Sequence, residues 1–276
     1  MDVIQRNFFR LIRYGAFNQK EQVEPMSVFK WGRLFQLAII HDVAGDVYEG
    51  LLRCRDQFFL HMTEEQWDIW EKTVNDIRHT PLSEDVEENE FLRADHLTNP
   101  LLNRKLQSIL DDEDSDTRTR QMLLTIIRTS RHILNEGVPI KELIRLGQEL
   151  RQNSGRTDFT MLGQWIKSLR FQQAANLQGT LLIELFGFEK EEIPFMEKED
   201  ESHAKDVALE LIELTHSRLK SYSFSQGEEN IFVHTNNGSA ILGHVRRSVR
   251  YFRYFPSETI TNFFASFAHS LSHIEE

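Results

Sequence analysis

The residues of this chain whose types and spacing best suit chemistry form a basic-aromatic segment near its C-terminus. No acidic residue occurs between Glu229 and Glu258, and the sequence HVRRSVRYFRYFP lies in this interval. Arginine and aromatic side chains alternate there, in a protein whose formal net charge is -11. The candidate ligand-binding residues are Arg246, Arg247, Arg250, Tyr251, Arg253 and Tyr254.

A helical conformation of this segment, ending before Pro256, would order its side chains into two neighbouring stripes. The stripes are an apolar one of Val245, Val249 and Phe252 and a cationic one of Arg246, Arg250 and Arg253. Guanidinium groups held along an apolar face suit a phosphate, a nucleic acid or carboxylates. The alternative is that the arginines pair with acidic residues elsewhere in the same chain, where ion pairs contribute little to stability.

The composition excludes several classes of protein. A pI of about 5.5 argues against general nucleic-acid binding, because attraction to phosphates dominates that affinity. No apolar run approaches the roughly 18 residues that span a bilayer. The first residues lack the uninterrupted apolar stretch of a signal peptide, so we expect a cytoplasmic protein.

Other candidate groups give no catalytic or metal site. Cys54 is the only cysteine, and its apolar stripe with Val43, Val47 and Leu51 predicts burial. His41 and Asp42 are adjacent, so we interpret them as a helix end rather than a general-base pair. The acidic runs 84–90, 111–116 and 189–201 indicate solvated loops and helix starts, with a metal site as the alternative. We therefore predict no catalytic residue, no metal ligand and no cofactor.

The elements that must position these side chains are mainly helical. Only 13 glycines and 6 prolines occur in 276 residues, and apolar residues recur at helical spacing. Such stripes are Val28–Trp31–Phe35–Ala38, Trp67–Trp70–Val74–Ile77 and Leu177–Leu181–Leu185. The fold class predicted is all-α or mainly α, a multi-helix bundle of about ten or more helices, with at most a small hairpin near 230–240.

Local signals mark helix ends and a division of the chain. Thr63 and Gln66 are spaced as a capping box, Pro100 suits a first turn, and Gly187 suits a C-terminal cap. We predict an N-terminal helical region over 1–80, an acidic connection with a short helix over 81–116, and a C-terminal helical region over 117–276. One continuous domain is the alternative.

Three stretches together resemble the helical parts of bacterial nucleotidyltransferase-like proteins, a branch related to the DNA polymerase β superfamily. They are FFRLIRYGAF with VFKWGRLFQLAIIHDVAGDVYEGL, then TIIRTSRHILNEGVPIKELIRLGQEL with MLGQWIKSLRFQQAANLQGTLLIELFGFEKEEIP, and finally RSVRYFRYFPSE. The resemblance covers about residues 1–60 and 120–265. It implies a helical shell of the kind that surrounds a nucleotidyltransferase site.

The catalytic motif of that superfamily is not found. Its Gly-Ser turn precedes an Asp-hydrophobic-Asp/Glu pair that holds Mg²⁺ for phosphoryl transfer. Here Gly238-Ser239 has no Asp anywhere after it, and Asp85 with Glu87 follows no Gly-Ser. The resemblance therefore implies a degenerate active site.

The function expected from the sequence is that of a non-catalytic nucleotidyltransferase-like helical protein. It would bind a protein partner or a small anionic ligand through the Arg/aromatic surface. A first alternative is an active nucleotidyl or phosphoryl transferase, using Mg²⁺, a nucleotide and carboxylates such as Asp85 with Glu87 or Asp111 with Asp112. A second is a structural, oligomerising helical bundle with a Phe-rich C-terminal docking helix.

Overall fold

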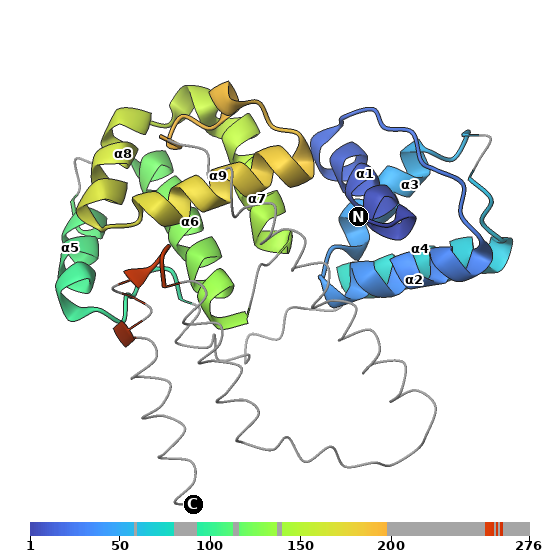
Figure 1. Ribbon diagram of the computed structural model, residues 1–276, viewed down its shortest axis with the longest axis horizontal. Helices are drawn as coiled ribbons and strands as arrows, with labels where there is room; N and C mark the ends of the chain where they lie inside the picture. The colour runs from blue at the N-terminus through green and yellow to red at the C-terminus, as the bar shows by residue number, and fades with distance from the viewer. Residues whose placement is uncertain are drawn as a thin grey trace, which may run out of the picture. The chain divides into compact units, whose positions relative to one another are not determined.

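The computed structural model of the protein has helices as its only regular elements in the residues that it describes, which are 1–57, 60–79, 93–112, 116–136, 140–197, 252–256, 258 and 260–261 (Figure 1). No strand occurs in these ranges, so the prediction of an all-α, multi-helix fold is confirmed for them. The hairpin considered near 230–240 lies outside the described residues.

Nine α-helices and two 3₁₀ helices occur in the described part of the chain. They are α1 (Val3–Phe17), α2 (Val28–Ile40), α3 (Ala44–Arg53), α4 (Glu64–His79), α5 (Pro100–Leu110), α6 (Thr117–Glu136), α7 (Ile140–Asn153), η1 (Ser154–Arg156), α8 (Phe159–Ser168), α9 (Gln172–Phe186) and η2 (Lys190–Glu192). They form two compact units. Unit 1 holds the described residues of 1–79 and residues 182–187, and unit 2 holds those of 93–181, 188–197 and 252–261.

Unit 1 is built on a close crossing of α1 and α3. Gly15 and Gly50 lie at the crossing, where a Cβ on Gly50 would be 2.1 Å from the carbonyl oxygen of Leu11. A Cβ on Gly15 would be 1.9 Å from the carbonyl oxygen of Asp46. Both positions therefore require glycine, because no side chain fits between the two backbones.

Aromatic side chains join α4 to α2 and α3 within unit 1. Phe35 meets Trp70 edge to face, with ring centroids 4.8 Å apart, and Tyr48 stacks on Trp70 at 6.3 Å. The predicted capping box of α4 is confirmed, since Thr63 and Gln66 exchange hydrogen bonds of 3.3 and 3.2 Å. The Gln66 side chain also donates to the Val28 carbonyl at 2.9 Å, so the same box ties α4 to α2.

Unit 2 is organised around α6, which packs against α7 and α8. Its core is formed by apolar positions with no exposed surface, among them Leu123, Ile126, Leu143, Leu162, Ile166, Leu177 and Leu181. The Gln178 amide on α9 donates to the Ile126 carbonyl at 3.0 Å and to Ser130 Oγ at 2.7 Å, both on α6. Apolar burial and these buried hydrogen bonds make α6 the support for other parts of the unit.

Two further helix-end predictions are confirmed. Pro100 is in the first turn of α5, after the N-cap Asn99, whose side chain accepts from two backbone N–H groups of that turn. Gly187 follows the end of α9 with φ of +64°, and its N–H donates to the Ile183 carbonyl at 3.0 Å. A left-handed residue after a helix is where glycine has no steric cost.

None of the described helices combines the length and the apolarity needed to cross a membrane.

Candidate functional site

Two of the six residues in the predicted Arg/aromatic surface fall within the described part of the chain. These are Arg253 and Tyr254, whereas Arg246, Arg247, Arg250 and Tyr251 lie outside it. The helical conformation considered for this segment does not include residues 252–254, which form a turn, and Pro256 itself is helical. Proline lacks an N–H and has its φ fixed near the helical value, so it starts a helix as readily as it ends one.

The order of buried and exposed side chains in this turn also differs from the predicted stripes. Phe252, placed on the apolar face by periodicity, exposes 45% of its surface, and Arg253 is exposed. Tyr254 and Phe255 are each only 4% exposed, and the Phe255 ring meets Phe171 edge to face at 6.2 Å. Tyr254 is therefore an interior residue that anchors the turn.

A buried ion pair holds the residues that follow the turn. Glu258 and Arg131 of α6 lie 3.6 Å apart, and their side chains are 5% and 4% exposed. The Glu258 carboxylate also accepts from Thr98 N at 3.1 Å, Thr98 Oγ1 at 2.9 Å and Asn99 N at 3.0 Å. These hydrogen bonds satisfy both carboxylate oxygens, which a buried charge requires.

The Arg131 guanidinium is also bound by the segment that leads into α5, through the same Nη1 atom that lies closest to Glu258. It donates to the His96 carbonyl at 2.8 Å. The Thr98 hydroxyl, which donates to Glu258, also lies 2.8 Å from the Thr261 hydroxyl. Residues 96–99, α6, Glu258 and Thr261 are thereby held together within unit 2.

Arg253 differs from most arginines of the described chain in its lack of partners. Arg6, Arg53, Arg93 and Arg151 each form an ion pair with a carboxylate, but Arg253 forms no hydrogen bond or ion pair with a described residue. An exposed phenylalanine and this arginine are thus adjacent on a turn whose neighbouring residues are fixed in the interior.

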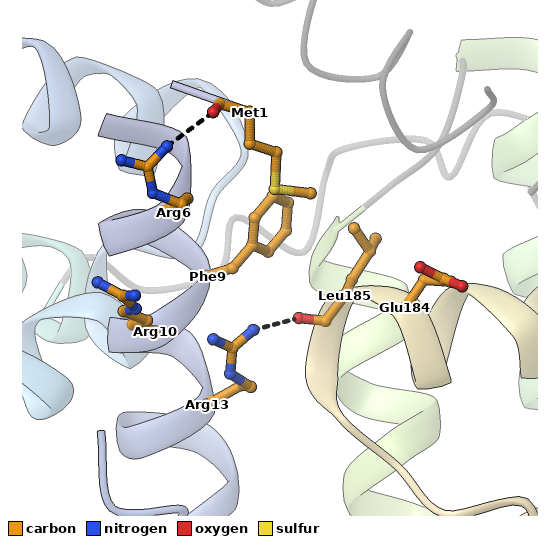
Figure 2. A pocket seen from close by; sticks show the side chains of 7 residues that line it. All are labelled: Met1, Arg6, Phe9, Arg10, Arg13, Glu184 and Leu185. Carbon is orange, nitrogen blue, oxygen red and sulfur yellow. Dashed lines mark hydrogen bonds between the residues drawn. The ribbon is translucent and has the colours of Figure 1, made fainter. Parts of the chain in front are cut away.

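A separate pocket of about 120 Å³ occurs within unit 1, on the arginine-bearing face of α1 (Figure 2). Its lining residues are Met1, Arg6, Phe9, Arg10, Arg13, Glu184 and Leu185. The arginines at positions 6, 10 and 13 follow helical spacing, which aligns them on one side of α1. Arg13 Nη1 donates to the Leu185 carbonyl at 3.0 Å, at the C-terminal end of α9.

Two carboxylates from the loop after α1 partly neutralise these arginines. Glu24 accepts from Arg6 at 2.8 and 2.7 Å and from Arg10 at 2.7 Å, and Glu21 pairs with Arg13. The hydrogen bonds from Arg6, together with the charges of Arg6 and Arg10, lower the pKa of Glu24 to about 2. Glu24 is therefore ionised at neutral pH.

The groups considered for nucleophilic or metal chemistry do not form a site in the described residues. Cys54 is fully buried, as predicted, and desolvation raises its pKa to about 11, which leaves very little thiolate. His41 is the C-cap of α2, also as predicted. Asp111 and Asp112 are exposed just after α5, and Asp85 and Glu87 lie outside the described residues. No group of three or more His, Cys, Asp or Glu residues is placed to hold a metal ion within the described ranges.

Neither the arginine face of α1 nor the Arg131–Glu258 pair was predicted from the sequence. The spacing of Arg6, Arg10 and Arg13 in RNFFRLIR could have shown the cationic face of α1. No local signal could have paired Arg131 with Glu258, because 127 positions separate them along the chain (258 − 131).

No protein-family model, no curated protein and no solved structure matches this chain. The resemblance to nucleotidyltransferase-like proteins therefore stays a prediction.

Proposed function

We propose that the protein is a non-catalytic helical binding protein that engages an acidic partner through its basic-aromatic segment, residues 246–254. The observation that carries this proposal is the anchored turn. Phe252 and Arg253 are exposed, while Tyr254, Phe255 and Glu258 next to them are buried. The backbone that carries this exposed pair is held by its buried neighbours before a partner binds.

Anchoring favours binding because it reduces the conformational entropy that association must overcome. Arg253 would also lose no internal ion pair with a described residue on contacting a carboxylate or phosphate. Phenylalanine and arginine are both enriched at protein interfaces, where the ring supplies apolar area and the guanidinium supplies directed hydrogen bonds.

The nucleotidyltransferase-like character of the helical shell belongs to the same proposal and rests on the sequence stretches that resemble that family. The alternative of an active transferase requires carboxylates that converge on bound metal ions. Asp111 and Asp112, one pair considered for it, are exposed at the end of α5.

The test is the charge reversal Arg253→Glu, with binding measured by fluorescence anisotropy of a labelled oligoglutamate peptide. The matched control is Arg156→Glu in η1, which reverses the charge of another exposed arginine of unit 2. We expect Arg253→Glu to weaken binding at least about tenfold and to change the free energy of unfolding by no more than about 0.5 kcal/mol. Arg156→Glu should bind as the wild type does.

Two results would contradict the proposal. One is equal weakening by the two variants, which would mean that the peptide senses only the net charge of the protein. The other is a wild-type protein that does not bind the acidic peptide at low ionic strength, where the attraction is least screened.

A further inference from the structure

We propose that the outward sides of α2 and α4 form a dimerisation face, on which a second copy of this chain places its α4 over α2 of the first copy. This inference goes beyond the proposed function, because it concerns a different unit and a different partner. Both helices belong to unit 1 and are neighbours there (Figure 1). The Phe35–Trp70 ring contact and the hydrogen bond from Gln66 to the Val28 carbonyl join them.

The outward side of α2 carries apolar side chains that the core of unit 1 does not cover. The buried side of this helix is formed by Trp31, Leu34, Leu37 and Ala38. Phe29 lies on the opposite side by helical spacing and exposes 70% of its surface, and Val28 next to it is also exposed. On α4, Ile69 exposes 45% of its surface. The two helices therefore offer the apolar area that a contact between helices requires.

The exposed charges of the two helices are of opposite sign. No acidic residue occurs between Glu24 and Asp42, so Lys30 and Arg33 are the only charged residues of α2. On α4, the exposed carboxylates outnumber the exposed Lys and Arg side chains; they are Glu64, Glu65, Asp68, Glu71 and Asp76, against Lys72 and Arg78. Neither Lys30 nor Asp68 forms an ion pair with a described residue. Both are therefore available to a partner of opposite charge.

A two-fold axis makes this face complementary to itself. Rotation about an axis that runs along the two helices places α2 of each copy over α4 of the other, so that basic and acidic sides meet twice. Lys30 is about 140° around α2 from Phe35, and Asp68 is about 160° around α4 from Gln66, so both lie on edges turned away from the neighbouring helix. Those two edges meet in this arrangement. The charge pattern therefore fits a second copy of the chain.

The size of the face determines how strongly the copies associate. Helices of 13 and 16 residues are about 20 and 24 Å long, and each is about 10 Å wide, which gives a face of about 400 Å². A standard stable interface buries about 800 Å² of each partner. The net charge of -11 on each copy also opposes association, although salt screens this repulsion. We therefore expect a reversible dimer with a dissociation constant in the micromolar range.

The experiment is sedimentation velocity of the full chain at physiological ionic strength, over concentrations from about 1 to about 300 µM. The wild type should pass from monomer to dimer in this range. Phe29→Ser should weaken the dimer at least about tenfold, because it removes the largest exposed apolar side chain of the face. Leu101→Ser is the matched control, since Leu101 is 73% exposed on α5 of unit 2, and it should dimerise as the wild type does.

A charge exchange tests whether α2 meets α4 of the second copy. Lys30→Glu and Asp68→Lys should each weaken the dimer at least about threefold, and the double variant should recover to near the wild-type affinity. Asp68→Lys makes the net charge less negative, so general repulsion alone would predict tighter association for it.

Three results would overturn the proposal. A wild type that remains monomeric throughout the concentration range would exclude the dimer without any variant. Equal effects of Phe29→Ser and Leu101→Ser would place the contact elsewhere. A double variant that associates no more tightly than the single variants would show that Lys30 and Asp68 do not meet across the two copies.

Discussion

At the scale of single residues, burial rather than distance decides what an ion pair contributes. Lys167 and Glu197 are only 2.6 Å apart, yet their side chains are 61% and 49% exposed, so water screens their attraction. Arg131 and Glu258 are 3.6 Å apart but nearly fully buried. Removing one buried partner takes away part of the compensation that the desolvation of the other charge requires.

We expect Glu258→Gln to lower the free energy of unfolding by about 3 to 5 kcal/mol, because it leaves Arg131 charged and buried. The matched control Glu197→Gln makes the same chemical change in the exposed pair and should cost no more than about 1 kcal/mol. Urea denaturation followed by tryptophan fluorescence measures both values. Similar costs for the two variants would show that the buried pair is not a structural anchor.

At the scale of elements, glycine positions distinguish a close crossing of two helices from an open stretch of helix surface. Gly50 lies where α3 meets the α1 backbone, and a Cβ there would approach the Leu11 carbonyl carbon to 2.8 Å and its oxygen to 2.1 Å. Gly32 of α2 has no atom within 4 Å of the same test position. Identical substitutions at these two sites therefore test packing and helix propensity separately.

We predict that Gly50→Ala lowers the free energy of unfolding by about 2 kcal/mol or more, because α1 and α3 must move apart. Gly32→Ala should instead raise it by about 0.5 to 1 kcal/mol, since alanine restricts the unfolded chain and favours a helix. Thermal and urea unfolding of the two variants give these values. A stabilised Gly50→Ala protein would contradict the close crossing.

At the scale of the whole molecule, the net charge of -11 reflects an excess of carboxylates over basic side chains. The environments of these carboxylates differ. Hydrogen bonding to Arg93 lowers the pKa of Asp95, and bonds from Thr119 lower the pKa of Asp116. Burial raises the pKa of Glu149 instead, so the cost of ionising this residue is present at neutral pH. Protonation at low pH should therefore destabilise the protein at Asp95 and Asp116, and it should remove an unfavourable buried charge at Glu149.

The lowered pKa of Glu24 predicts the pH range over which this residue changes the stability of the protein. Its pKa in the folded protein, about 2, is below the ordinary value of 4.5, so its contribution is complete above about pH 4.5 and is lost as the pH falls towards 2. We expect the Glu24→Gln variant to lose less stability than the wild type over this interval. Glu71→Gln, which removes an exposed carboxylate of α4, is the control. Urea midpoints at several pH values decide the prediction, and parallel curves for Glu24→Gln and the wild type would refute it.

The sequence by itself determined the helical class and many local features of this protein. The apolar spacing predicted the buried stripe that ends at Cys54, and the Thr63–Gln66 box, Pro100 and Gly187 predicted helix ends that the structure confirms. These signals are local, because periodicity, capping and backbone preference act over one or two helical turns. The same stripes placed Val28 and Ile77 inside, whereas they are 51% and 48% exposed near helix ends.

Only the tertiary structure decided which charged residues meet and which side chains of the basic-aromatic segment are buried. Glu258 is paired with Arg131, and Leu185 is brought to the arginine face of α1, from distant parts of the chain. Tyr254 is buried and Phe252 is exposed in a segment that forms a turn at 252–254. Contacts between distant residues depend on how whole helices pack, and helical spacing alone carries no information about that packing.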